Sequence, residues 1–191
     1  MSPIPLGILA AAGITPGATG SFDLLQTTIL TGNQTQVDFT NLISSYGSTY
    51  QHLQLRVTMR GSQSQQWELL GIRFNNVTSG GSYKSHQLIA ALGGLFSQEI
   101  GATDKFEFEG FQGATAGSGV FGAGVIDILD PFETNKNKTV RARTARLVDA
   151  NTSLSAGLFV STNAVNTITI FARSQMVAGS RFSLYGLKAS A

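Results

Sequence analysis

The chain contains no cysteine among its 191 residues. Disulfide bridges and thiolate metal sites are therefore excluded, whereas the compartment stays open, because a protein can work outside a cell without disulfides. Charged side chains are also scarce: they make up 13% of the sequence, against roughly 25% in an average soluble protein. The formal net charge of +2 is too small for a general nucleic-acid binder.

Long hydrophobic runs are missing as well. The sequence has no apolar stretch of about 18 residues, so we expect no membrane insertion. The opening MSPIPLGILAAAG has an apolar run that ends in small residues, as signal peptides do. It has no Lys or Arg before that run, and Pro5 interrupts the run, so the pattern does not favour a signal peptide.

Residues 1–21 do contain apolar side chains, but they have no charged side chain and no hydrophobic period. Proline and glycine recur in this segment and break any helix. Its larger apolar residues need an apolar groove to bury them, and they are Ile4, Leu6, Ile8 and Leu9. We expect either a frayed terminus or an extended N-terminal arm that uses these residues to dock onto a neighbouring subunit.

The rest of the chain is dominated by strand patterns. In 52–60, Leu53, Leu55 and Val57 alternate with polar residues, which is the two-residue period of a strand with one wet face. Similar segments are 22–30, 36–40, 67–75, 83–91, 105–111, 119–129, 138–148, 157–161, 167–173 and 181–187. Only 87–95 (QLIAALGGL) could form a helical turn or two. We predict one all-β domain over 22–191, a single jelly-roll-like antiparallel β-sandwich.

Catalytic motifs are weak. Gly117–Gly122 fits G-x-G-x-x-G, but a strand-like segment follows it where a dinucleotide site needs a helix. A zinc site could use the only histidines, His52 and His86, although no close spacing supports one. Glu107 and Glu109 share a strand face and could flank a glycosidic bond, or could simply form the wet face opposite two phenylalanines. We therefore expect no enzyme activity, no metal and no cofactor.

Five basic residues cluster within eleven positions: Lys136, Lys138, Arg141, Arg143 and Arg146. On a strand, Arg141 and Arg143 share one face, and Lys138 and Arg146 share the other. No aromatic residue lies among them to stack on a base, so nucleic-acid binding is not expected. An inter-subunit patch or plain solvation near a turn fits better.

Aromatic residues leave a second binding hypothesis open. Jelly rolls include lectins, which hold sugars on exposed aromatic rings. The candidates are Trp67, Tyr46, Tyr50 and Tyr83, with Trp67 and Tyr83 the preferred glycan contacts. Core packing is the commoner fate of such residues.

Several segments together resemble a family of tailed-bacteriophage virion proteins. They are 50–56 (YQHLQLR), 73–75 (RFN), 179–188 (GSRFSLYGLK), 5–10 (PLGILA) and 126–130 (IDILD), so the likeness spans nearly the whole chain. One departure is the loop 76–78 (NVT), where relatives have Gly-Asp after R-F-N, so no role of that Asp carries over.

The resemblance implies a structural protein without known catalysis, usually described as a minor tail or tail-fibre-like component. The leading hypothesis is a non-enzymatic virion protein of the tail tip or fibre that contacts the host surface, including host glycans. A capsid decoration or cement protein on the phage head is the first alternative. A carbohydrate-binding module and a glycan-cutting enzyme are the others. Virion subunits are symmetric oligomers, and we expect a homo-oligomer, with a trimer favoured, bound to other virion proteins.

Overall fold

The computed structural model describes residues 22–188, and β-strands dominate this part of the chain. The strands and the one short helix of the described residues are β1 (Phe22–Ile29), β2 (Gln34–Phe39), α2 (Leu42–Tyr46), β3 (His52–Met59), β4 (Trp67–Phe74), β5 (Tyr83–Ala91), β6 (Gly94–Thr103), β7 (Phe106–Gln112), β8 (Gly122–Leu129), β9 (Lys138–Arg146), β10 (Asn151–Phe159), β11 (Ile168–Met176) and β12 (Arg181–Leu187). The all-β prediction is confirmed.

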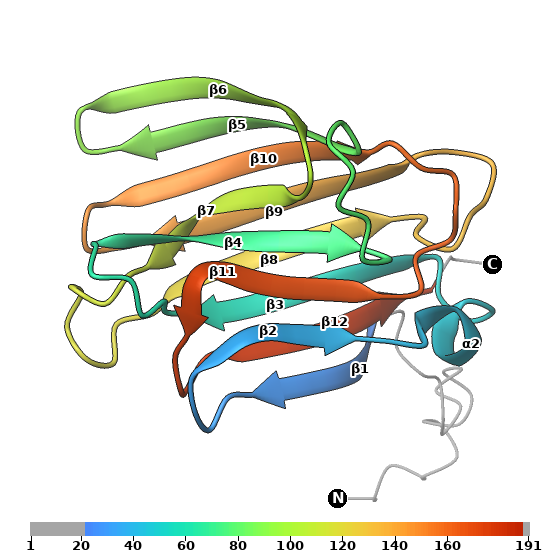
Figure 1. The fold of residues 1–191 in the computed structure, drawn as a ribbon, viewed down its shortest axis with the longest axis horizontal. Helices are drawn as coiled ribbons and strands as arrows, with labels where there is room; N and C mark the ends of the chain where they lie inside the picture. Colours follow the sequence, from blue (N-terminus) through green and yellow to red (C-terminus); the bar gives the residue numbers. More distant parts are fainter. Residues whose placement is uncertain (1–21, 189–191) are drawn as a thin grey trace, which may run out of the picture.

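These strands form two antiparallel sheets that face each other (Figure 1). The large sheet has the order β1-β12-β3-β8-β9-β10-β5-β6, and the small sheet has the order β2-β11-β4-β7. Eight of the strands, in the orders β1-β12-β3-β8 and β2-β11-β4-β7, alternate between the sheets as the paired Greek keys of a jelly roll do. The predicted jelly-roll sandwich is therefore the observed fold. The predicted arm, 1–21, lies outside the described residues.

Two hairpins are inserted into this jelly roll. β5 and β6 come between β4 and β7 in the chain, and β9 and β10 come between β8 and β11. Both hairpins pair side by side and continue the large sheet beyond β8, so its far edge is β6. In Figure 1 the β5–β6 hairpin lies above the small sheet, at the top of the view. We call these four strands the hairpin extension.

The core lies between the two sheets. The alternation of β3 places Leu53, Leu55 and Val57 inside, each at most 3% exposed, so the predicted wet and dry faces of this strand are confirmed. Rings from different strands meet at the centre of the core, with Phe106 between Phe74 (5.7 Å) and Tyr83 (4.9 Å). Edge-to-face pairs of this kind add about 0.5–1.5 kcal/mol each to the burial of the rings.

The segment 87–95, which could have formed a helical turn or two, belongs instead to the β5–β6 hairpin, whereas the strand predicted over 83–91 is confirmed as β5. Leucines at 88, 92 and 95 have helical spacing, but Gly93 has φ 104°, which stops a helix and closes a two-residue turn. Strand β10 also begins at Asn151, six positions before the predicted start at 157. The helix α2 was not expected from the sequence; it places Leu42 in the core.

Candidate binding surfaces

The residues predicted to form a docking arm, Ile4, Leu6, Ile8 and Leu9, lie outside the described residues. Their role stays a prediction.

Tyr83 is the predicted site residue that the structure contradicts. Its side chain is 0% exposed, because position 83 of β5 faces the core. The hydroxyl group donates to the carbonyl oxygens of Phe74 (3.2 Å) and Val77 (3.1 Å) and accepts from the Phe74 N–H (3.0 Å). Burial raises the pKa of Tyr83 above its usual value. Tyr83 therefore joins β5 to the end of β4 and cannot contact a glycan at the surface.

Trp67 lies half-buried at the start of β4, on the outer face of the small sheet. The Arg173 guanidinium stacks over its ring at 5.2 Å, and Arg73 stacks in the same way over Phe171 at 4.7 Å. A shallow pocket of about 330 Å³ lies between these pairs, with Gly71 and Glu107 in its lining. Trp67 does not line this pocket, and its role in glycan contact stays a prediction.

Tyr46 and Tyr50 pack on each other beside β1, with ring centroids 6.2 Å apart. The Tyr50 hydroxyl donates to Asp23 (3.0 Å), and the Tyr46 hydroxyl accepts from Gln26 (3.1 Å). Hydrogen bonds from Lys188 and from Tyr50 lower the pKa of Asp23. Both tyrosines thus tie β1 to the segment before β3, which is a structural role.

The two glutamates considered for glycoside hydrolysis lie on the outward face of β7, while Phe106 and Phe108 beside them are buried. Glu107 lies 3.6 Å from the Lys105 ammonium, and Glu109 lies 3.7 Å from the Arg146 guanidinium. Each carboxylate thus has its own cationic neighbour, which favours the plain reading of a charged outer face.

The two histidines are far apart. Three strands, β8, β9 and β10, separate β3 with His52 from β5 with His86, which makes about 19 Å at the usual strand spacing. His52 Nδ1 accepts a hydrogen bond from the Asp130 N–H (3.0 Å), and His86 Nε2 lies 3.0 Å from the Ser97 hydroxyl. These residues cannot share one zinc ion. Within 22–188, no group of three or more His, Asp or Glu side chains is placed to hold a metal, and no helix is long and apolar enough to cross a bilayer.

The basic cluster divides between the two faces of β9, as the alternation predicts. Lys138 is fully buried, and its ammonium donates to the carbonyl oxygens of Glu133 (2.6 Å), Lys136 (2.8 Å) and Thr162 (3.1 Å). Burial lowers the pKa of Lys138. Arg146, 6% exposed, holds Asp149 through two hydrogen bonds of 2.7 Å. These two cations are structural.

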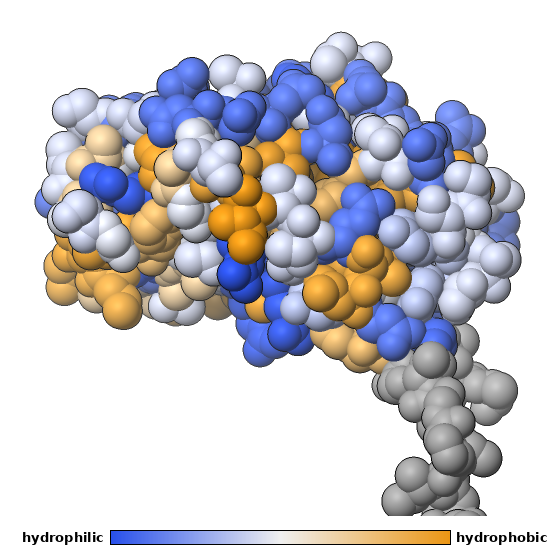
Figure 2. Space-filling model, turned by 90° about the horizontal axis from the view of Figure 1, so that it is seen from below, coloured by the Kyte–Doolittle hydropathy of each residue, from blue (hydrophilic) through white to orange (hydrophobic). Residues whose placement is uncertain are grey.

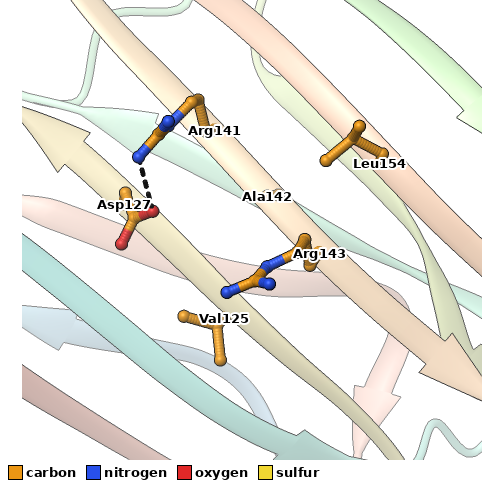
Figure 3. Close-up of a pocket in the computed structure, with 6 residues that line it drawn as sticks. All are labelled: Val125, Asp127, Arg141, Ala142, Arg143 and Leu154. Carbon is orange, nitrogen blue, oxygen red and sulfur yellow. Dashed lines mark hydrogen bonds and ion pairs between the residues drawn. The ribbon is translucent and has the colours of Figure 1, made fainter.

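Arg141 and Arg143 instead point outward from the large sheet and border a shallow groove (Figure 3). Arg141 reaches Asp127 on β8 (3.4 Å), which also accepts a hydrogen bond from Gln54 (2.8 Å). Arg143 lies between Val125 on β8 and Leu154 on β10, which are its cross-strand neighbours. It has no ion pair or hydrogen bond to any other side chain in the described part of the protein.

The groove continues across β10 toward β5, where two further hollows of about 230 Å³ and 370 Å³ follow the first one of about 320 Å³. Ala156 lines both of the further hollows, because its small side chain lies between Arg141 and His86. Lys84 and Glu99 lie at the far end. We call this surface the outer groove. Its open shape and its guanidinium groups suit binding of an anionic group, and among its lining residues we find no activated nucleophile.

The hairpin extension also exposes apolar side chains, two of which, Leu88 and Leu154, line the outer groove as well. Seven of the eleven large hydrophobic residues that are exposed on the described protein belong to these hairpins and their turns: Leu88, Leu92, Leu95, Phe96, Leu147, Val148 and Leu154. Leu147 is 86% exposed and Leu92 is 75% exposed. Figure 2 shows hydrophobic side chains gathered at the left end of the molecule, where both hairpin turns lie in Figure 1. We call these seven residues the apolar end.

The apolar end could not be predicted from the strand pattern alone. A signal was present, because a hairpin turn normally carries polar residues, whereas Leu92 and Leu147 occupy turns here. It was hidden because the β5–β6 turn had not been recognised.

Comparison of the chain with protein-family models, with curated proteins and with solved structures finds no match.

Proposed function

We propose that this protein is a non-enzymatic structural subunit of a bacteriophage virion, located in the tail at its tip or fibre. The observation that carries the proposal is the apolar end on a jelly-roll domain. Jelly rolls are frequent in viral coat proteins and lectins. The sequence resemblance to phage virion proteins supports the same reading.

The exposed leucines support assembly because a free protein gains nothing from them. Large apolar patches on soluble proteins mark interaction surfaces or cause aggregation. Leu92, Leu95 and Leu147 each expose at least two thirds of their surface. Contact with a neighbouring subunit would remove that surface from water, at about 25 cal/mol for each Å² of apolar area buried.

The scarcity of charge supports the same proposal. With 13% charged residues, the surface has little long-range repulsion between copies. Close packing of many copies is then electrostatically tolerable, as a virion requires. The outer groove would be left for a further contact, and its arginines suit an acidic group on a neighbouring virion protein or on the host surface.

The test is immunogold electron microscopy of intact phage particles with an antibody raised against this protein. We expect label at the distal end of the tail. Label spread over the head would instead assign a capsid decoration protein and overturn the tail position. Particles without any label would contradict the virion proposal itself.

A second measurement uses the apolar end. Phage that carry Leu92→Ser together with Leu147→Ser should incorporate less of the protein, measured by quantitative mass spectrometry of purified particles. The matched control is Gln36→Ser, an exposed position on β2 of the small sheet. Equal incorporation of both variants would show that the apolar end is not the contact.

A further inference from the structure

Strand β6 is an unprotected edge of the large sheet. It is ten residues long, it pairs with β5 on one side, and no strand of residues 22–188 pairs with its other side. The hairpin turn pairs Ala91 with Gly94, so in the alternating antiparallel pattern Leu95, Ser97 and Glu99 turn their backbone N–H and C=O groups away from β5. This edge therefore offers a row of backbone donors and acceptors.

The other sheet edges offer a shorter or less regular row of free backbone groups than β6 does. β1 has an irregular register between Leu24 and Gln26, and β2 is only six residues long. β7 turns its edge toward the large sheet, where Gln87 Nε2 donates to the Glu107 carbonyl oxygen (2.5 Å). β6 has no proline and no lysine, and its register with β5 is unbroken from Gly94 to Ile100. Bulges, charged side chains and proline are the usual guards against edge pairing. On β6 these are limited to Glu99 and to a register shift beyond Ile100, which leaves the seven residues from Gly94 to Ile100 in regular pairing with β5.

We propose that β6 pairs antiparallel with β6 of a second copy of this chain, around a two-fold axis at Gln98. The pairing joins two large sheets into one continuous sheet. The side chains support this partner because the strand is complementary to itself. With Gln98 opposite Gln98 of the second copy, Phe96 faces Ile100 and Leu95 faces Gly101, each contact occurring twice.

Charge selects this register over its neighbour. Two residues that lie directly opposite on neighbouring strands have their side chains on the same face of the sheet. The two-fold axis can therefore move only from one residue to another, and not to a point between two residues. Moving the axis to Glu99 keeps nearly the same overlap but places two carboxylates opposite each other, which is unfavourable. With the axis at Gln98, Glu99 faces the hydroxyl of Ser97, whose own neighbour is His86 (3.0 Å).

The apolar side chains of β6 would lose solvent-exposed surface in this contact. Leu95 is 68% exposed and Phe96 is 51% exposed in the single chain. Phe96 lies opposite Ile89 of β5, so the Phe96–Ile100 contacts would extend an apolar row that already exists on that face. The pairing is isologous and gives a dimer, which differs from the trimer that the sequence analysis favoured. It does not depend on the proposed virion role.

Single-cysteine variants test the register directly, because the chain has no cysteine of its own. In the proposed register Gln98 forms a non-hydrogen-bonded pair with its copy, with Cα atoms about 4.5 Å apart, which is within disulfide range. Gln98→Cys should therefore form a disulfide-linked dimer in a glutathione redox buffer. Ile100→Cys is the matched control: position 100 lies about 13 Å along the strand from its own copy, so it should stay reduced.

Charge at position 97 provides the second test, read by sedimentation equilibrium. Ser97→Lys places a cation opposite Glu99 of the second copy twice, and it should tighten the dimer about two- to tenfold. Ser97→Glu should weaken the dimer by a similar factor. Circular dichroism would verify that both variants fold, since position 97 is exposed.

Three results would overturn the proposal. They are a wild-type chain that stays monomeric at every soluble concentration, equal cross-linking of both cysteine variants, and dimerisation that ignores the charge at position 97. Immunogold labelling of phage particles would be unaffected by any of them, so this failure is distinct from failure of the virion role.

Discussion

The jelly roll and the hairpin extension distribute their side chains in opposite ways, although they share one sheet. In the jelly roll, the inward positions of β3 and β8 are apolar, with Leu55 and Ile126 fully buried. Toward the turns of the extension, inward positions include Gln87 and Ser153, which are 1% exposed. Its outward positions and turns carry leucines.

This contrast separates two tasks. Apolar burial between the two sheets stabilises the fold, and the jelly roll contains most of it. The extension contributes less to that core and exposes apolar surface, which is why we propose that its leucines contact other subunits. Mutations of buried side chains should therefore change stability, whereas mutations of the exposed apolar residues of the extension should change association and leave stability nearly unchanged.

The largest expected effect is on the core. Phe106→Ala removes a fully buried ring that packs on Phe74 and Tyr83, and should lower the free energy of unfolding by about 3–5 kcal/mol. Phe96→Ala, the same change on β6, should lower it by less than about 1 kcal/mol at low protein concentration. Urea denaturation measures both. If both variants lost a similar free energy of unfolding, the core and the hairpin extension would not differ in their contribution to stability.

The next effect concerns the buried cation at the start of β9. Lys138→Met leaves the three carbonyl oxygens that its ammonium holds without that donor, and should cost about 2–3 kcal/mol. Lys84→Met, at an exposed position of β5, should change stability by less than about 0.5 kcal/mol. Thermal unfolding of both variants is the measurement. Equal melting temperatures would mean that Lys138 is not a structural cation.

A glycine in the small sheet gives a smaller effect. A Cβ atom at Gly71 would lie 2.4 Å from the Phe171 ring, so Gly71→Ala should destabilise the fold by about 1–3 kcal/mol. Gly80→Ala, in the loop before β5, has open space around it and should be nearly neutral. Urea midpoints compare the two. A neutral Gly71→Ala would show that Phe171 moves aside freely.

The smallest effect is on the pH dependence. Burial alone would raise the pKa of Asp130, but hydrogen bonds from Lys136 and Gln51 and the charge of Lys136 outweigh it and lower the pKa. A lowered pKa stabilises the fold above the ordinary value of 3.8, and this stabilisation is lost as the pH falls below it. Asp130→Asn should remove about 0.2–1 kcal/mol of stability at pH 7 and reduce the fall below pH 4. If the stability of the wild type and of Asp130→Asn depended on pH in the same way, the ion pair between Asp130 and Lys136 would not stabilise the fold.

The sequence predicted the jelly roll because strands with one solvent-exposed face alternate between apolar and polar residues. β3 and β9 alternate cleanly, so their periods, faces and even the division of the basic cluster could be deduced. β5 could not be oriented in this way, because its inward residues (Tyr83, Gln87) and its outward residues (His86, Leu88) are equally mixed in polarity. The sequence therefore left Tyr83 as a candidate glycan contact, with core packing as the commoner fate, and the structure shows that it is buried.

The pairing of the hairpin extension could not be deduced either. Which strands become neighbours depends on contacts between residues far apart in the chain, such as Leu154 with Leu88. The outer groove combines Arg143 of β9 with side chains of β8 and β10, and this combination exists only once the sheet order is known. The sequence predicted that Arg141 and Arg143 share one face of a strand, but it did not predict which residues surround them.

The central claim, that the hairpin extension is the surface through which copies associate, is tested most directly by amide hydrogen exchange at low and at high protein concentration. We predict slower exchange at high concentration for Leu95, Ser97 and Glu99 of β6, with unchanged rates in β3 and β12. Exchange in β6 that stays equally fast at both concentrations would contradict the claim.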